Sequence, residues 1–172
     1  MVESMAKKLV KAGRAARKAL PRTAKTAASK RASAETPADQ HLALLKGIYK
    51  RWGETKGGNV DEILNLLADD VVWRSIANGL HGLNFAKEPL TKPNVRSYFE
   101  NLGKDWELVF FDVERMIAQN HTVVVVAECS YRHRRTGKSF MSPKVDIWDF
   151  KRGKVVGFFE YFDTASAIRS AL

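Results

Sequence analysis

Hydrophobic residues recur every three or four positions in the chain just beyond its first 40 residues. The positions that share this helical spacing are Leu42, Leu45, Ile48, Tyr49 and Trp52. They predict an amphipathic helix that ends at Gly57-Gly58. Two more helices are predicted, over Val60–Leu67, with Asn59 as its N-cap, and over Asn94–Gly103.

The hydrophobic period then changes to that of strands. Alternating β-branched and aromatic residues predict a short strand at Val71–Ile76 and four longer ones near the C-terminus. The four longer runs are Glu107–Ile117, Thr122–His133, Ser139–Phe150 and Lys154–Phe162. Asp163 is predicted to cap a last helix that reaches Leu172. Helices grouped against an antiparallel sheet describe an α+β fold.

Residues 1–40 lack this patterning and have a different composition. They hold ten Lys and Arg against three Asp and Glu, a net charge of +7 out of +10 for the 172-residue chain, and no aromatic residue. Such a segment cannot bury enough apolar surface to offset the entropy lost on ordering. The sequence therefore predicts a disordered basic tail at 1–40 and a folded domain at 41–172.

Three interpretations of the tail remain open. It is a solubilising extension, an electrostatic attachment to nucleic acid or an anionic membrane surface, or an organelle transit peptide. No stretch approaches the ~18 apolar residues of a membrane span, which argues against an integral membrane protein. The apolar core of a secretory signal, about 7–15 residues, is also missing. A cytoplasmic location is expected, with organelle targeting as the alternative.

The number of cysteines and the spacing of histidines predict neither a disulfide nor a metal site. The single cysteine, Cys129, excludes an intramolecular disulfide and a cysteine-based zinc site, and its apolar surroundings predict a buried thiol. The four histidines show no paired ligand spacing. They are His41, His81, His121 and His133. No metal and no cofactor are predicted.

Three segments resemble a known family. The stretches 58–73 (GNVDEILNLLADDVVW), 148–156 (WDFKRGKVV) and 160–165 (EYFDTA) are similar to SnoaL-like polyketide cyclases and ketosteroid-isomerase-related proteins of the nuclear-transport-factor-2-like (NTF2-like) superfamily. For residues 41–172 the resemblance implies a cone of curved antiparallel sheet closed by helices. It also implies an internal ligand pocket and a homodimer, commonly formed through the sheet. It implies no single activity, because this superfold hosts isomerases, cyclases, dehydratases and non-catalytic modules.

The last hairpin decides which residues face such a pocket. Phe150–Gly153 predicts a type I turn followed by glycine in the left-handed region. This turn pairs Phe150 with Lys154 and, further along, Lys144 with Glu160. One face then carries Lys144, Asp146, Trp148, Phe158, Glu160 and Phe162. A two-residue turn would instead place the two carboxylates on opposite faces.

Two acids in unlike surroundings can divide catalytic work, and an acid among aromatic rings tends to keep its proton. The resemblance places Asp146 (in Asp146-Ile147-Trp148-Asp149-Phe150) at the protonated aspartate of the isomerase oxyanion hole. It places Glu160 near the acid/base aspartate of the cyclases. We therefore predict Glu160 as base and Asp146 as hydrogen-bond donor. The remaining predicted pocket-lining residues are Trp73, Trp148, Phe158, Phe162, Lys144 and Tyr49.

The sequence also departs from the isomerase pattern. The position of the isomerase's catalytic aspartate falls near Ser75, and serine cannot serve as that base unaided. The isomerase tyrosine of the first helix falls near Arg51, two residues from Tyr49. Ketosteroid isomerisation itself is therefore not expected.

Two functions follow as rival hypotheses. The first is a protein that binds a hydrophobic carbonyl compound and acts as an acid/base isomerase, cyclase or dehydratase. The alternative is a non-enzymatic dimeric module tethered by its basic tail, with Lys144 and Glu160 as a structural ion pair. A cavity of about 300 Å³ or more lined by Asp146 and Glu160 would favour the first. A cavity filled by aromatic side chains would favour the second.

Overall fold

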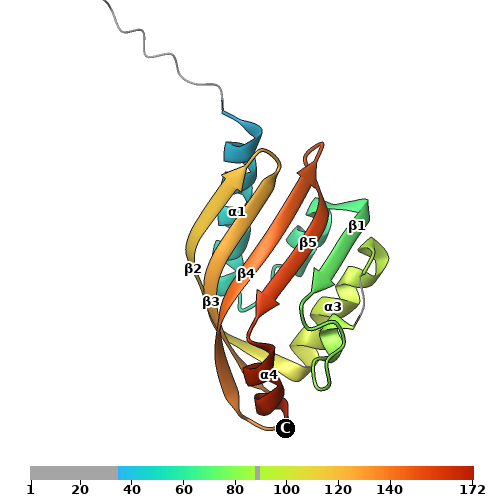
Figure 1. Cartoon of the computed structure of the whole chain (residues 1–172), viewed down its shortest axis with the longest axis vertical. Helices are drawn as coiled ribbons and strands as arrows, with labels where there is room; N and C mark the ends of the chain where they lie inside the picture. Colours follow the sequence, from blue (N-terminus) through green and yellow to red (C-terminus); the bar gives the residue numbers. More distant parts are fainter. Residues whose placement is uncertain (1–34, 88–89) are drawn as a thin grey trace, which may run out of the picture. The chain divides into compact units, whose positions relative to one another are not determined.

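A computed structural model describes residues 35–87 and 90–172 of the chain (Figure 1). The tail predicted at 1–40 lies outside the described residues as far as position 34. The elements in chain order are α1 (Pro37–Glu54), α2 (Val60–Leu66), β1 (Leu67–Ser75), the short 3-10 helix η1 (Asn84–Ala86), α3 (Lys92–Asp105), β2 (Trp106–Gln119), β3 (Thr122–His133), β4 (Ser139–Lys151), β5 (Lys154–Phe162) and α4 (Thr164–Ala171). Within the described ranges, no helix is long and apolar enough to cross a membrane.

The strands form one curved sheet in the order β1-β5-β4-β3-β2 (Figure 1). Strands β2 to β5 are an antiparallel meander, and β1 joins the edge by pairing in parallel with β5. The predicted α+β class and the four-strand meander are therefore confirmed. Helix α3 connects β1 to β2 at the opposite edge of the sheet, and the meander from β2 to β5 then returns the chain to β1, so that the long crossover needed for a parallel pair is present.

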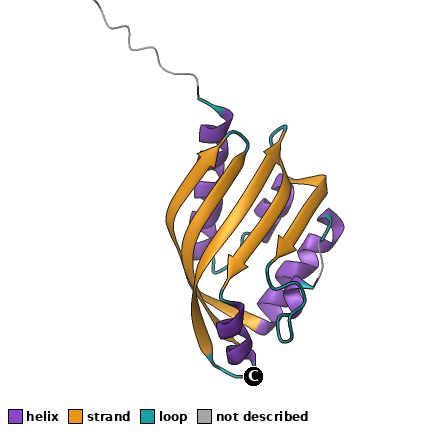
Figure 2. Cartoon of the chain, in the orientation of Figure 1, coloured by secondary structure: helices purple, strands orange, loops and turns teal. Residues whose placement is uncertain are grey.

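The helices gather on one face of the sheet and leave the other face open (Figure 2). Helix α1 packs against β2 and β3, α3 packs against β1, and α4 contacts β3 and β4. Residues alternate between the two faces along each strand, so every second side chain is directed toward the helices. The enclosed face carries the core and the site described below.

Helix α1 begins earlier than the predicted domain boundary at residue 41. Thr36 and Asp39 form a reciprocal capping box, and Pro37 occupies the first turn, where its missing N–H costs no hydrogen bond. The helix ends before Gly57, whose φ of +86° is left-handed and favours glycine. The predicted apolar stripe holds at Leu45, Ile48, Tyr49 and Trp52, which are all buried.

The two other predicted caps have different outcomes. Asp163 caps α4 as predicted, because its carboxylate accepts a hydrogen bond from the Ser166 N–H at 2.9 Å. Asn59 stands at the start of α2, but its side chain makes no capping bond. Its amide instead donates to the Ile48 carbonyl oxygen of α1 at 3.2 Å. Asn59 thus joins α1 to α2 rather than capping, which is a correction to the prediction.

The predicted pairing of the β4–β5 hairpin is wrong, although the predicted face is right. The turn has two residues, Arg152 and Gly153, both with left-handed φ values (52° and 75°). A bulge at Val156 then adds one residue to β5 and restores the alternation. As a result Asp146 pairs directly with Glu160, Trp148 with Phe158, and Lys144 with Phe162. All six predicted residues share the enclosed face.

Candidate functional site

The enclosed face of the sheet holds a narrow cavity of about 70 Å³. At about 10–15 Å³ for each water, this space takes roughly five waters and lies well below the roughly 300–1,000 Å³ of drug-sized ligand pockets. Aromatic rings from both the sheet and the helices form most of the wall. They include Tyr49, Trp52, Trp73, Tyr98, Phe99, Trp106, Phe111, Tyr131, Trp148, Phe158 and Phe162. The site is therefore mostly apolar, with space for a compact ligand only.

Three charged side chains meet in this aromatic wall. Lys144 and Asp146 come from β4 and Glu160 from β5, and each is at most 8% exposed. The Lys144 ammonium forms an ion pair with Glu160 and lies 3.0 Å from Oδ1 of Asp146. Buried charges are stable only when paired, so the single lysine compensates two acids. The predicted Lys144–Glu160 ion pair is present, and it extends to Asp146.

Tyr49 connects helix α1 to this cluster. Its hydroxyl donates to Oδ2 of Asp146 at 2.6 Å, and the Trp148 indole N–H donates to the same hydroxyl at 2.8 Å. The chain of donors ends on Asp146, whose other oxygen, Oδ1, has no hydrogen-bond partner among the described residues. The lysine approaches that oxygen closely but off the direction of a hydrogen bond.

Tyr98 plays the corresponding part for Glu160. The Tyr98 hydroxyl, from α3, donates to Oε1 of Glu160 at 2.8 Å, while Lys144 approaches Oε2. Each carboxyl group therefore has its own buried tyrosine, and the two tyrosines come from different helices. The cluster joins α1 and α3 to the centre of the sheet.

The protonation preferences of the cluster follow from burial and neighbours. Burial raises the pKa of Asp146; Lys144 opposes this effect and Glu160 adds to it, and the net pKa is raised. Burial acts to lower the pKa of Lys144, but attraction to Asp146 and Glu160 outweighs it and the pKa rises. Lys144 therefore stays an ammonium at neutral pH, while Asp146 takes up a proton more readily than an ordinary aspartate.

Two other buried residues on this face, Cys129 and Ser75, are neither charged nor bonded to the cluster. Burial raises the pKa of the Cys129 thiol to about 12, so the thiol stays protonated and poorly nucleophilic, as its predicted buried position implies. Ser75 is buried beside Glu160 through the β1–β5 pairing, and its hydroxyl accepts the Ala77 N–H at 3.2 Å. Ser75 thus ends β1 with a turn hydrogen bond. The carboxylate beside it comes from Glu160 on the neighbouring strand β5.

The cavity collects all of the residues predicted to line it. Trp73, Trp148, Phe158, Phe162, Lys144 and Tyr49 border it, together with Asp146 and Glu160. Tyr98 contacts the cluster but was not among the predicted site residues; it lies within the helix predicted over Asn94–Gly103. Spacing identifies the buried face of a helix but not which buried hydroxyl finds a carboxylate. In the described part of the chain, no group of three or more His, Cys, Asp or Glu residues is arranged to hold a metal ion.

Solved structures with the same fold come from several bacteria. An NTF2-like protein from Burkholderia thailandensis is 24% identical, with a TM-score of 0.64, and the match covers 80% of this chain and 98% of that chain. A protein with a ketosteroid-isomerase-like fold from Catenulispora acidiphila, solved with trimethylamine, is 10% identical (TM-score 0.60; 74% and 91% covered). IdmH from Streptomyces antibioticus, described as a candidate polyketide cyclase, is 13% identical (TM-score 0.58; 76% and 97% covered).

These likenesses show the fold, and the sequence comparison shows the family. No curated protein matches the chain. A family model described as a SnoaL-like domain matches residues 48–158, which is more than half of the chain. The predicted resemblance and the predicted NTF2-like fold are thus confirmed, and the chain belongs to the SnoaL-like domain family.

Proposed function

We propose that this protein binds a compact carbonyl compound in its aromatic cavity and transfers a proton on it. The observation that carries the proposal is the direct pairing of Asp146 with Glu160 inside a mostly apolar wall. Two acids in a site of low polarity serve proton transfer best when one is ionised and the other neutral. The names of the structural neighbours, a candidate polyketide cyclase among them, agree with this class of chemistry.

In this proposal Glu160 is the base. Lys144 and Tyr98 both present hydrogen to its carboxylate, an arrangement suited to the anion. Glu160 takes a proton from the carbon next to the ligand carbonyl, the C–H bond breaks, and its electron pair moves onto the carbonyl oxygen as an enolate. In a conjugated ketone, Glu160 returns the proton to the far carbon of the dienolate and gives an isomer. Where a second carbonyl is in reach, the enolate carbon attacks it and closes a ring, and the alkoxide oxygen formed takes the proton back from Glu160.

Asp146 is the donor that stabilises the enolate oxygen. Burial shifts the pKa of Asp146 upward, toward the protonated form, and Oδ1 accepts no hydrogen bond from the described residues, although the Lys144 ammonium lies 3.0 Å from it. A neutral carboxylic acid at that position donates to the developing negative charge without adding a charge of its own. Tyr49 holds Oδ2 and so fixes the orientation of the carboxyl group.

The cavity volume limits the ligand. A space of about 70 Å³ fits a single small ring or a short chain, and larger ligands require the aromatic walls to separate. The cavity is smaller than the volume of about 300 Å³ that would by itself favour the ligand-binding hypothesis, although both carboxylates line it. The proposed substrate class is therefore narrower than hydrophobic carbonyl compounds in general.

Deuterium exchange tests this function without knowledge of the natural substrate. The full chain is incubated with cyclopentanone in D₂O, and loss of the hydrogens next to the carbonyl is followed by proton NMR. We expect exchange well above that of buffer alone, because the ketone α-hydrogens are the ones that Glu160 would remove. Exchange equal to that of buffer, with the ketone bound in the cavity, would contradict proton transfer.

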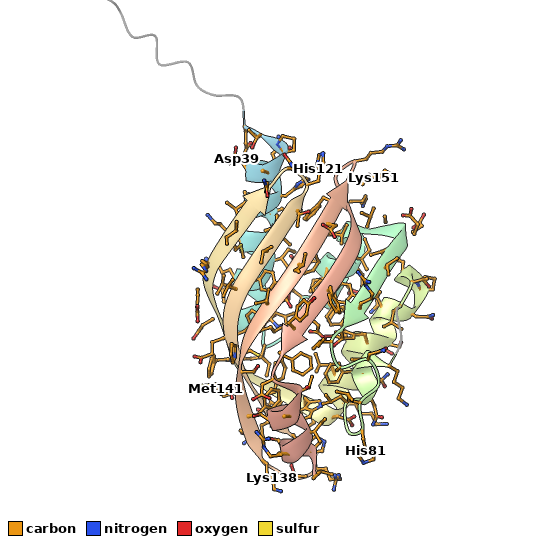
Figure 3. All side chains as sticks on the ribbon, viewed as in Figure 1. Asp39, His81, His121, Lys138, Met141 and Lys151 are labelled. Carbon is orange, nitrogen blue, oxygen red and sulfur yellow. The ribbon has the colours of Figure 1, made fainter. Side chains whose placement is uncertain are left out.

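We also propose that the protein is a dimer formed through the open face of the sheet. That face carries exposed apolar side chains on β1, β2, β4 and β5, among them Val72 (47% exposed), Ile117 (53%), Met141 (59%) and Tyr161 (39%). Figure 3 shows Met141 projecting from the sheet. An exposed apolar face of this extent is typical of an interaction surface, and the family resemblance implies a sheet-to-sheet dimer.

Replacing Ile147 tests the dimer. Ile147 lies in the central strand β4 and pairs with Val124 and Phe159 on the open face. Ile147→Glu should convert the dimer to a monomer in light-scattering chromatography, because an unpaired charge is excluded from a closed apolar interface. Leu80→Glu, at an exposed apolar loop residue away from the sheet, is the matched control and should leave the dimer intact. A wild-type monomer would contradict the proposal.

The tethered-module alternative depends on the net charge of +7 in residues 1–40. Residues 1–34 lie outside the described ranges, so attachment to nucleic acid or an anionic surface stays a prediction from composition. It is compatible with a ligand site in the folded domain, because the two properties belong to different parts of the chain.

A further inference from the structure

The hydrogen-bonding groups that line the cavity are not all used by the protein. The hydroxyls of Tyr49 and Tyr98 donate to the two carboxyl groups, and the Trp148 indole N–H donates to Tyr49. Two indole N–H groups, those of Trp73 and Trp106, have no partner among the described residues, although each residue is only 2% exposed. Buried N–H groups without a partner are rare in folded proteins, so each requires an explanation.

Trp73 is held firmly in the wall next to the cluster of acids. Its ring stacks on Phe158 with centroids 3.8 Å apart, and it meets Tyr98 at 5.5 Å and Trp148 at 5.8 Å in edge contacts. Packing on several sides fixes the side-chain rotamer and therefore the direction of the N–H group. The neighbours are aromatic rings, which offer no strong acceptor.

Trp148 shows that burial alone does not leave an indole without a partner. It lies on the same face, two strands from Trp73, is equally buried, and donates to the Tyr49 hydroxyl at 2.8 Å. The difference between the two indoles is the acceptor that the fold supplies to one and not to the other. Trp106 is the second indole without an acceptor, and it packs against His133 and Phe140 rather than near the acids.

Trp73 and Trp106 both border the cavity, and their indole N–H groups are donors without an acceptor among the described residues. A ligand that presents oxygen acceptors satisfies these groups, whereas a hydrocarbon of equal size leaves them unpaired. A site built to hydrogen-bond its ligand rejects analogues that lack the matching group.

We propose that the buried indole N–H of Trp73 is a specificity-determining donor to an acceptor oxygen of the ligand, so that the cavity selects compact oxygenated molecules over hydrocarbons of the same shape. This inference rests on the proposed ligand site but not on proton transfer. Trp73 binds and orients, while the acids perform the chemistry.

The test compares two ligands of nearly equal shape, cyclopentanone and methylenecyclopentane, in which a C=CH₂ group replaces C=O. The full chain is labelled with ¹⁵N, and the indole signal of Trp73 is assigned by its loss in Trp73→Phe. We expect cyclopentanone to move this signal downfield and methylenecyclopentane to leave it nearly unmoved. Equal shifts with the two ligands would overturn the inference; Trp73→Phe serves only to assign the signal, and the shifts are compared in wild-type protein.

Affinities in the variant give the second measurement. Trp73→Phe keeps an aromatic ring but removes the N–H, so ketone binding should weaken by about tenfold while binding of the alkene changes by no more than about twofold. An equal loss for both ligands would mean that Trp73 contributes shape alone and would overturn the inference.

The outcomes separate this inference from the proposed proton transfer. Ketone exchange in D₂O together with an unmoved Trp73 signal overturns the role of Trp73 and leaves proton transfer standing. A ketone-specific indole shift without exchange supports the role of Trp73 and removes the proton transfer. Absence of ketone binding overturns both.

Discussion

Replacing Lys144 with methionine is expected to lower the free energy of unfolding by about 3–5 kcal/mol at neutral pH. The ammonium is the only cation in contact with Asp146 and Glu160 within the described cavity wall, and the side chains of both acids are less than 5% exposed. Methionine fills similar volume but leaves two buried carboxyl groups without a compensating charge. Urea unfolding at pH 7.5, followed by circular dichroism, measures the loss.

The loss of stability in Lys144→Met is expected to depend on pH. Without Lys144, the opposing influence on Asp146 disappears and its already raised pKa rises further. A carboxyl group with a raised folded pKa binds more protons folded than unfolded, so stability falls as pH rises from the unfolded value of about 4 through the folded value. The loss in free energy of unfolding caused by Lys144→Met should therefore be smallest near pH 4 and largest above neutrality.

Two further variants control for the change in shape. Lys151→Met removes an exposed lysine from the end of the same strand and should change stability by less than about 0.5 kcal/mol. The triple variant Lys144→Met, Asp146→Asn, Glu160→Gln removes all three ionisable groups together and should recover most of the lost stability. If Lys144→Met alone were as stable as wild type at pH 7.5, the two buried acids would not need Lys144 for stability, and the prediction would be wrong.

Replacing Glu160 with glutamine is expected to reduce the rate of ketone deuterium exchange by about 10²–10⁴-fold. The amide has nearly the same shape, its oxygen still accepts from Tyr98, and Lys144 keeps Asp146 as its partner. The base is lost while the fold and the cavity are kept. NMR exchange rates, with cyclopentanone affinity measured in parallel, separate a loss of chemistry from a loss of binding.

The matched control is Glu100→Gln on α3, an exposed glutamate that should leave the exchange rate unchanged. Removal of the Glu160 charge also removes one of the influences that raise the pKa of Asp146, so that pKa should fall in the variant. An exchange rate in Glu160→Gln equal to that of wild type would assign the base to another group and contradict the role given to Glu160.

The hairpin between β4 and β5 shows the reach of sequence reasoning. Strict alternation of side chains identified Lys144, Asp146 and Glu160 as members of one face. It paired Lys144 with Glu160, however, whereas the structure pairs Asp146 with Glu160. A two-residue turn alone would have separated the acids, and the bulge at Val156 returns them to the same face. Bulges depend on how the sheet bends against its helices, which a local pattern does not record.

The sequence by itself determined the order and type of the elements, the buried stripe of α1 and the face that carries the acids. These properties depend on local periodicity and on turn and capping residues, which are written in neighbouring positions. Only the tertiary structure decided that Tyr49 and Tyr98 reach the carboxyl groups and that Trp73 is left without an acceptor. It also decided that the cavity is as small as about 70 Å³. Such contacts join residues some 60 to 100 positions apart, and their geometry is set by close packing of side chains from several elements at once.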